Sequence, residues 1–158
     1  MLLEKLEREK GLRKISKMLD DSKFQRFLIK DFEHWRVYLH EQQNYLGRVY
    51  LWAKRENINF FNMTHVEAVE FMHVGGLVTK SIRDAFNPDK FDYAIFGNTA
   101  PHIHMHIIPR YKFGRLFCGG SFEDRNWGKN YAPYDKREFD ERVLTEIRLT
   151  IRDKLENK

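Results

Sequence analysis

Cysteine is scarce in this sequence and long apolar runs are missing, and each shortage excludes a class of protein. Cys118 is the one cysteine, so the chain cannot form an internal disulfide framework or a cysteine-rich zinc site. No apolar run approaches the roughly 20 residues that a membrane-spanning helix needs. The first segment, Met1–Arg8, becomes charged at once, unlike a secretory signal peptide. We therefore expect a cytoplasmic protein without membrane contact.

Internal repeats, low-complexity segments and long blocks of basic residues are also missing. The 158 residues are 42% hydrophobic, which is typical of a single globular domain with a buried core. The formal net charge of +5 favours anionic partners, either phosphate-bearing small molecules or nucleic acid. Because the charges are spread along the chain, a solvated surface explains most of them. Nucleic acid is therefore not an expected partner.

Apolar periodicity predicts an α+β fold, with an antiparallel β-sheet meander, one long helix packed on it, and further helices near both ends. A capping box at Thr64 begins the long helix, its apolar stripe continues to Ile82, and Asn87-Pro88 ends it. Strands are predicted at residues 35–39, 48–53, 91–96 and 102–108.

A change in the apolar pattern near residue 30 predicts the domain organisation. We expect an N-terminal helical extension over residues 1–30 and a core domain over residues 31–158. The extension should contain a helix at 2–20 and a short second helix around 24–28. Residues 110–134 are interpreted as a loop, followed by a final helix with an apolar stripe.

Three of the seven histidines stand at alternate positions, His102, His104 and His106. Successive side chains of a strand point to opposite faces, so these imidazoles share one face. A row of rings whose nitrogens need hydrogen-bond partners is a poor core, so we interpret it as a functional site. Each of the other four histidines, taken alone, is typical of a structural residue.

Two kinds of chemistry fit this row of imidazoles. A His-x-His pair on a strand can bind zinc with a third ligand from elsewhere, or a neutral imidazole can attack phosphorus and form a covalent intermediate. The preceding Gly97, Asn98 and Thr99 favour the second, because they offer backbone, amide and hydroxyl groups to phosphate oxygens. No carboxylate or cysteine that would support a metal lies between Asp92 and Ile108.

The segment His102-Ile-His-Met-His-Ile-Ile108 resembles the histidine triad (HIT) pattern at every position, especially that of the family's dinucleoside polyphosphate hydrolase branches. The following Pro109-Arg110, the strand and basic turn at 46–55 and the helix start at 62–64 are also similar. The resemblance extends over residues 32–112. It implies a HIT-like fold, a small-molecule nucleotide substrate and a homodimer.

The resemblance also implies a role for each matching residue. His104 is expected to be the nucleophile that takes up a nucleoside monophosphate, with His102 orienting it. Phosphate and nucleotide contacts are expected from His106, Gly97, Asn98, Thr99 and His40. No metal ligand and no cofactor are implied, and Mg²⁺ held by the substrate's own phosphates is compatible with this chemistry.

We therefore expect an enzyme that acts at the α-phosphate of a nucleotide through a covalent His104 intermediate. Hydrolysis of a dinucleoside polyphosphate and hydrolysis of a nucleoside phosphoramidate both remain open. The alternatives are a nucleotide-binding sensor or partner protein with little turnover, and a zinc-dependent hydrolase. Trp127–Pro133 is as well suited to contacting the far end of the substrate as to forming a packed loop. The dimer contact is expected on the helix Val66–Ile82, where Gly75-Gly76 allows close approach.

Overall fold

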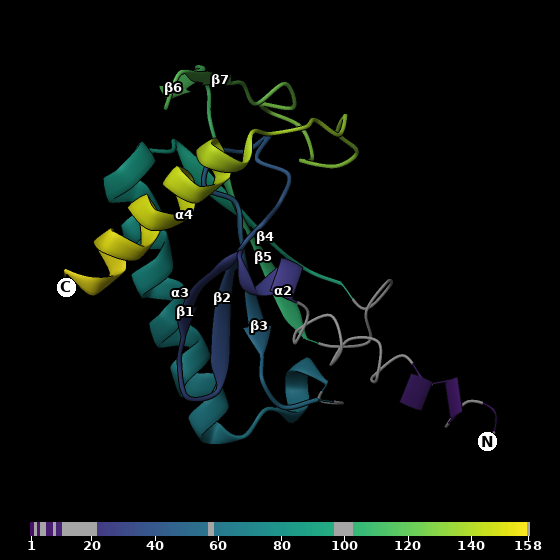
Figure 1. Cartoon of the computed structure of the whole chain (residues 1–158). Coiled ribbons are helices and arrows are strands. Elements are labelled where there is room, and N and C mark those ends of the chain that lie inside the picture. The colour runs from purple at the N-terminus through teal and green to yellow at the C-terminus, as the bar shows by residue number, and fades with distance from the viewer. Residues whose placement is uncertain are drawn as a thin grey trace.

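The computed structural model describes residues 1, 3, 6, 7, 9, 10, 22–56, 59–96 and 103–157. Most of the helix expected at residues 2–20 lies outside these residues. In chain order the elements are α2 (Ser22–Gln25), β1 (Leu28–Asp31), β2 (Trp35–Leu39), β3 (Val49–Ala53), η1 (Phe60–Asn62), α3 (His65–Phe86), β4 (Lys90–Ile95), β5 (His104–Arg110), β6 (Arg115–Phe117), β7 (Gly120–Phe122) and α4 (Glu141–Glu156) (Figure 1).

Five strands form one antiparallel sheet in the order β1-β2-β3-β5-β4. The first three strands are consecutive, as in a meander. The long α3 then carries the chain to the far edge of the sheet, so β4 becomes an edge strand and β5 returns into the gap beside β3. This arrangement confirms the predicted α+β fold, and it places the histidine-bearing strand inside the sheet.

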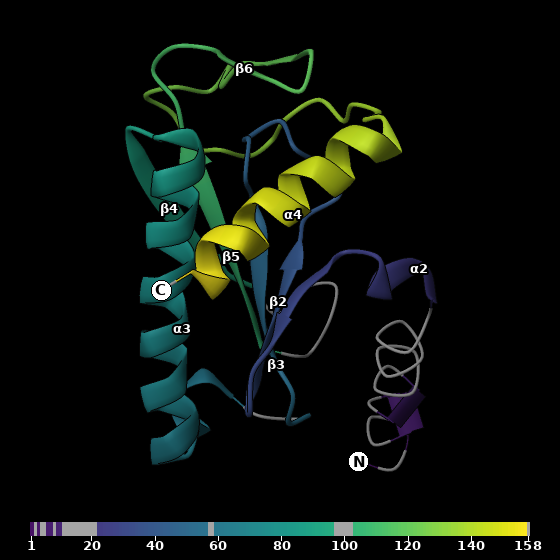
Figure 2. The same cartoon turned by 60° about the vertical axis from the view of Figure 1, so that its left-hand side comes forward.

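Both long helices cover the same face of the sheet, while α2 lies on the other side (Figures 1 and 2). The predicted capping box is present, since Thr64 Oγ1 accepts from the Glu67 backbone and the Glu67 carboxylate accepts from the Thr64 backbone. α3 is capped at its C-terminal end by Asn87, which has a left-handed φ of 49° and directly precedes Pro88. Fully buried apolar side chains from α3, α4 and the sheet form the core, including Val78 and Ile151. Each contributes about 1.5–3 kcal/mol by leaving water.

The prediction of a short helix around residues 24–28 is wrong in the bounds of that helix. α2 ends at Gln25, and Leu28 begins β1, which pairs with β2 across the boundary expected between residues 30 and 31. Pairing supplies the backbone hydrogen bonds that an isolated helix of this length cannot sustain. The Leu28 carbonyl also accepts hydrogen bonds from the side chains of Arg148 and Arg152 of α4.

The region expected to be a loop contains a hairpin, β6–β7, so that expectation is also partly wrong. Its turn residues, Cys118 and Gly119, have φ values of 49° and 77°. Two successive residues with positive φ are typical of the tight turns that match strand twist. Within the described residues, no helix is both long and apolar enough to cross a membrane.

Candidate active site

The register of β5 places two of the predicted site residues in the middle of the sheet. His104 pairs with Trp52 and His106 pairs with Tyr50, so all four side chains lie on the face opposite α3. His104 and His106 are 8% and 9% exposed, and their ring centroids lie 5.2 Å apart. The alternate residues of β5, such as Met105, belong to the core on the other face. The structure therefore brings these two imidazoles together on one face of the sheet.

Four other predicted site residues, Gly97, Asn98, Thr99 and His102, lie outside the described residues. They belong to the segment that joins β4 to β5. Their roles as phosphate ligands and as the orienting histidine stay predictions.

Aromatic rings surround the two histidines. Trp52 is stacked on His104, with centroids 4.8 Å apart and planes 18° from parallel. The ring centroids of Tyr50 and His106 lie 4.7 Å apart. Phe24 of α2 adds a further ring, whose centroid lies 6.1 Å from that of Trp52. These rings exclude water on several sides, which strengthens electrostatic interactions at the imidazoles.

Arg48 also lies beside the histidines, although the sequence pattern did not single it out. It directly precedes β3, and its guanidinium is 2% exposed. Its Nη2 lies 3.2 Å from Nδ1 of His106, and its Nη1 donates to Oη of Tyr134 at 2.7 Å. Positions 48, 50 and 52 alternate along one strand, so the sequence places Arg48 on the same face as Tyr50 and Trp52 but does not give the register against the histidine-bearing strand.

Glycine is required immediately before Arg48. Gly47 has a φ of 86°, and a Cβ there would lie 2.9 Å from the Phe86 ring. Its backbone N–H donates to the Gln43 side chain at 2.7 Å. Left-handed backbone and close packing together exclude larger residues, so this turn fixes where Arg48 enters the site.

Burial is the main influence on the pKa of His106. Removal from water, the Arg48 guanidinium and the neighbouring His104 together lower the pKa of His106 to about 3. His106 is therefore neutral at physiological pH. A neutral imidazole carries one N–H donor and one acceptor nitrogen.

His40 lies beside the same cluster. It is 5% exposed, its ring centroid is 4.6 Å from Tyr50 and 5.8 Å from His106, and its Nδ1 accepts from the Gln42 backbone at 2.9 Å. Burial, followed by Arg48, holds the pKa of His40 well below its usual value. Its predicted contact with the nucleoside stays a prediction.

The C-terminal segment containing Trp127–Pro133 is packed onto the histidine-bearing face. Arg110 at the end of β5 is fully buried, forms ion pairs with Asp92 and Asp124, and donates to the backbone carbonyls of Asn126 and Lys129. The segment then brings the rings of Tyr131 and Tyr134 within 5.2 and 5.1 Å of the Arg48 guanidinium carbon. A segment that is distant from Arg48 in the sequence thereby lies beside the histidines.

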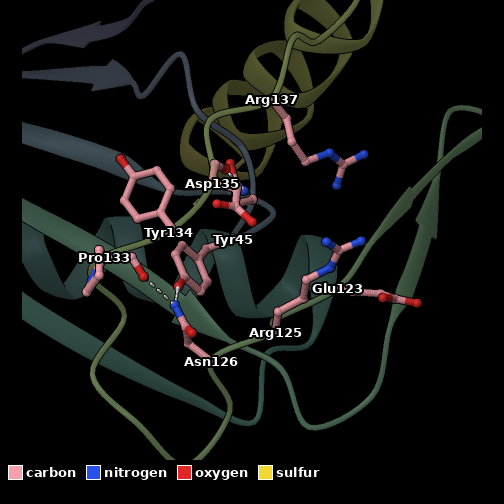
Figure 3. A pocket seen from close by; sticks show the side chains of 9 residues that line it. Tyr45, Glu123, Arg125, Asn126, Pro133, Tyr134, Asp135 and Arg137 are labelled. Carbon is pink, nitrogen blue, oxygen red and sulfur yellow. Dashed lines mark hydrogen bonds between the residues drawn. The ribbon is translucent and has the colours of Figure 1, made fainter.

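Two hollows adjoin this segment. An open groove of about 650 Å³ follows β4 beside Asn130 and Tyr131. A smaller pocket of about 220 Å³ has a mixed lining, with Arg125 and Arg137 beside Glu123 and Asp135 (Figure 3). The opposed charges of the smaller pocket favour no single kind of ion. The groove is the more relevant of the two, since Ala94 on its wall pairs with His106.

In the part of the chain that the structure describes, no three histidine, cysteine, aspartate or glutamate side chains are grouped so as to hold a metal ion. His102 is not among the residues described. The zinc-based alternative therefore depends on a residue that the structure does not place.

Comparison with solved structures supports the fold. A hypothetical histidine triad nucleotide-binding protein from Sulfolobus tokodaii is 21% identical, with a TM-score of 0.65 over 83% of this chain and 84% of its own. Diadenosine triphosphate hydrolase from Plasmodium falciparum is 17% identical, with a TM-score of 0.61 over 84% and 78%. A zinc-bound histidine triad protein from Mycobacterium smegmatis is 17% identical, with a TM-score of 0.58 over 83% and 84%.

Sequence comparison gives the family. A search of curated proteins found no match. Residues 22–113 match the sequence model of the HIT domain, and this segment contains β1 to β5, α3 and all three alternating histidines. The match extends over more than half of the chain, and the chain therefore belongs to the HIT family.

Proposed function

We propose that the protein is a nucleotide hydrolase or nucleotidyl transferase that acts at the α-phosphate, with His104 as the nucleophile. The observation that carries this proposal is the pair His104 and His106 on a buried aromatic face, with His106 neutral beside the Arg48 cation. A neutral imidazole can donate to a phosphate oxygen while a second one attacks phosphorus. The fold shared with a diadenosine triphosphate hydrolase supports the same reaction class.

The reaction proceeds in two displacements. A ring nitrogen of His104 forms a bond to the α-phosphorus, and the bond from phosphorus to the leaving group breaks with its electron pair. The leaving group takes up a proton from solvent or an acid in the site. Water then attacks the same phosphorus, the nitrogen–phosphorus bond breaks, and the electron pair returns to His104 as water loses its proton. The products are a nucleoside monophosphate and the free leaving group.

The leaving group is either a second nucleotide's phosphates or an amine. The groove beside β4 supports a large leaving group, because it opens next to Ala94 and Phe96, both near His106. Its Asn130 and Tyr131 come from the packed C-terminal segment. We propose that this segment contacts the departing half of the substrate.

A substrate panel tests this proposal. Dinucleoside polyphosphates, aminoacyl adenylates and adenosine phosphoramidate would be incubated with the protein, and the products identified by chromatography and mass spectrometry. We expect nucleoside monophosphate as a common product, with the best substrate revealing the leaving group. Binding without turnover across the whole panel would instead favour the nucleotide sensor.

Zinc content distinguishes the remaining alternative. We propose that the protein, purified without added metal, holds much less than one zinc per chain and keeps its nucleotide affinity after chelation. Elemental analysis checks the first point and calorimetry the second. One tightly held zinc per chain, lost together with activity, would establish the zinc-dependent hydrolase. That outcome would resemble the zinc-bound state of the Mycobacterium smegmatis protein.

We also propose a homodimer that forms across α3 and β4. Val69 and Met72 on α3 and Tyr93 on β4 are 55%, 72% and 56% exposed. Met72 and Tyr93 line an apolar groove of about 380 Å³ together with Gly75 and Gly76. A patch on one helix and one edge strand can meet its own copy about a twofold axis, which is the commonest symmetry of oligomers.

A further inference from the structure

We infer that Arg48 is a positioning residue, which holds His106 in the tautomer that presents Nε2–H to the substrate's phosphate. The inference rests on the proposed function of the site. It adds a group to the reaction that lies outside the row of histidines.

The contact fixes the direction of the hydrogen bond. Arg48 Nη2 lies 3.2 Å from His106 Nδ1. A guanidinium has only donors and keeps its proton at any physiological pH, so Nδ1 must be the acceptor. In a neutral imidazole the proton then resides on Nε2. A histidine that lacked this partner could place its proton on either nitrogen.

The Arg48 cation is buried among neutral partners. Its contacts are the Tyr134 hydroxyl, His106 and the faces of Tyr131 and Tyr134. Among the residues that the structure describes, no carboxylate forms an ion pair with it, and its Nε is buried without a hydrogen-bond partner. An uncompensated buried charge costs stability. An anion bound on the histidine face would offset that cost.

The guanidinium is held in place from a distant part of the sequence. Tyr45 donates to the Tyr131 carbonyl, and Asn126 donates to both the Tyr45 hydroxyl and the Tyr131 carbonyl. These bonds hold the backbone of Tyr131, and Asn126 also donates to the carbonyl of Pro133, which directly precedes Tyr134. A long arginine side chain is thereby limited to one position, as a group that orients another must be.

The tautomer can be measured directly. In protein with ¹⁵N-labelled histidine, long-range ¹H–¹⁵N spectra distinguish protonated from unprotonated ring nitrogens. The titratable side chains around His106 are His40, His104 and Tyr50, so His106 is assigned by comparison with His106→Gln. We expect Nδ1 of wild-type His106 to be unprotonated and Nε2 protonated from pH 5 to 8. A proton on Nδ1 in this range would overturn the inference, whatever the enzyme's activity.

Variants test whether Arg48 maintains this state. Arg48→Met keeps the length but removes the donor and the charge, and Arg48→Lys keeps the charge and a donor. We expect Arg48→Met to show mixed tautomers and kcat lower by about 10- to 100-fold, as when a group that orients a functional imidazole is lost. Arg48→Lys should recover part of the rate and most of the tautomer preference. Arg26→Met, which removes an exposed ion pair, is the matched control.

The outcomes separate this inference from the proposed function. If Arg48→Met keeps the Nε2–H tautomer and the wild-type kcat while remaining folded by circular dichroism, Arg48 only packs the C-terminal segment. If Arg48→Met does not fold, the tautomer of His106 in Arg48→Lys and in the wild-type protein still tests whether Arg48 positions His106. Full activity in His104→Ala would reject the proposed function, and the wild-type tautomer would still report on Arg48.

Discussion

Trp52 and His104 form a face-to-face stack in which the electron-rich indole meets the proposed nucleophile. Attack on phosphorus places positive charge on the His104 ring, and an aromatic face attracts a cation by about 0.5–2 kcal/mol. In the proposed reaction, the stack therefore favours the state in which His104 carries the nucleotide over the free imidazole.

Replacing Trp52 should slow formation of that state. We expect Trp52→Leu to lower the single-turnover rate by about fivefold to 20-fold, and Trp52→Phe to lose less, because it keeps an aromatic face. Rapid-quench kinetics would measure both rates. Thermal unfolding serves as the control for lost packing. Equal rates in the two variants, at comparable stability, would show that the stack plays no electrostatic part.

The roles of single residues were only partly predictable. The period-two spacing of His104 and His106 is visible in the sequence, because it depends on one strand alone. The contact of Arg48 with His106 depends on the register between β3 and β5, and on Tyr134, which is far away in the sequence. Local periodicity contains no information on either.

The capping box of α3 joins a helix to the end of β3. The Glu67 carboxylate accepts from Arg55 at 2.6 and 2.7 Å and from the Thr64 backbone at 2.7 Å. The hydrogen bonds from Arg55 are the largest influence, and with those from Thr64 they lower the pKa of Glu67 from 4.5 to about 2. The ionised carboxylate thereby fixes the start of α3 beside the chain that leaves β3.

The stability that Glu67 provides should depend on pH. Because its pKa is lower in the folded state, the contribution is complete above about pH 5 and disappears as the pH falls toward 2. We expect Glu67→Gln to lower the free energy of unfolding by about 1 kcal/mol at pH 7, as when a cap is lost. Urea unfolding at pH 7 and pH 3 measures the difference. A wild-type advantage that grows at pH 3 would contradict this account.

At the level of elements, the long helix and the paired central strands were predictable, whereas the short elements were not. Phe24, Phe27 and Leu28 fit a helical spacing as well as a strand, and only pairing with β2 decides between them. β6 and β7 have three residues each, which is too few for a periodic pattern. Their turn at Cys118 depends on backbone angles that this residue type rarely adopts.

At the level of the whole molecule, the exposed face of α3 predicts self-association. We expect a dimer at micromolar concentration, and we expect Met72→Glu to convert it to a monomer by burying an unpaired charge in the interface. Leu116→Glu is the matched control, since Leu116 is also exposed but lies on the β6–β7 hairpin. Light scattering coupled to gel filtration would give the masses. A monomeric wild-type protein would contradict this prediction.

The central claim is that His104 carries the nucleotide during turnover, and trapping that intermediate tests it most directly. The wild-type protein would be mixed with its best substrate, quenched without acid, digested and examined by mass spectrometry. We predict a nucleoside monophosphate on His104, stable to base and labile to acid. His104→Ala should bind nucleotide within about tenfold of wild type while losing turnover. Near wild-type turnover by His104→Ala, with no adduct on the wild-type residue, would contradict the account.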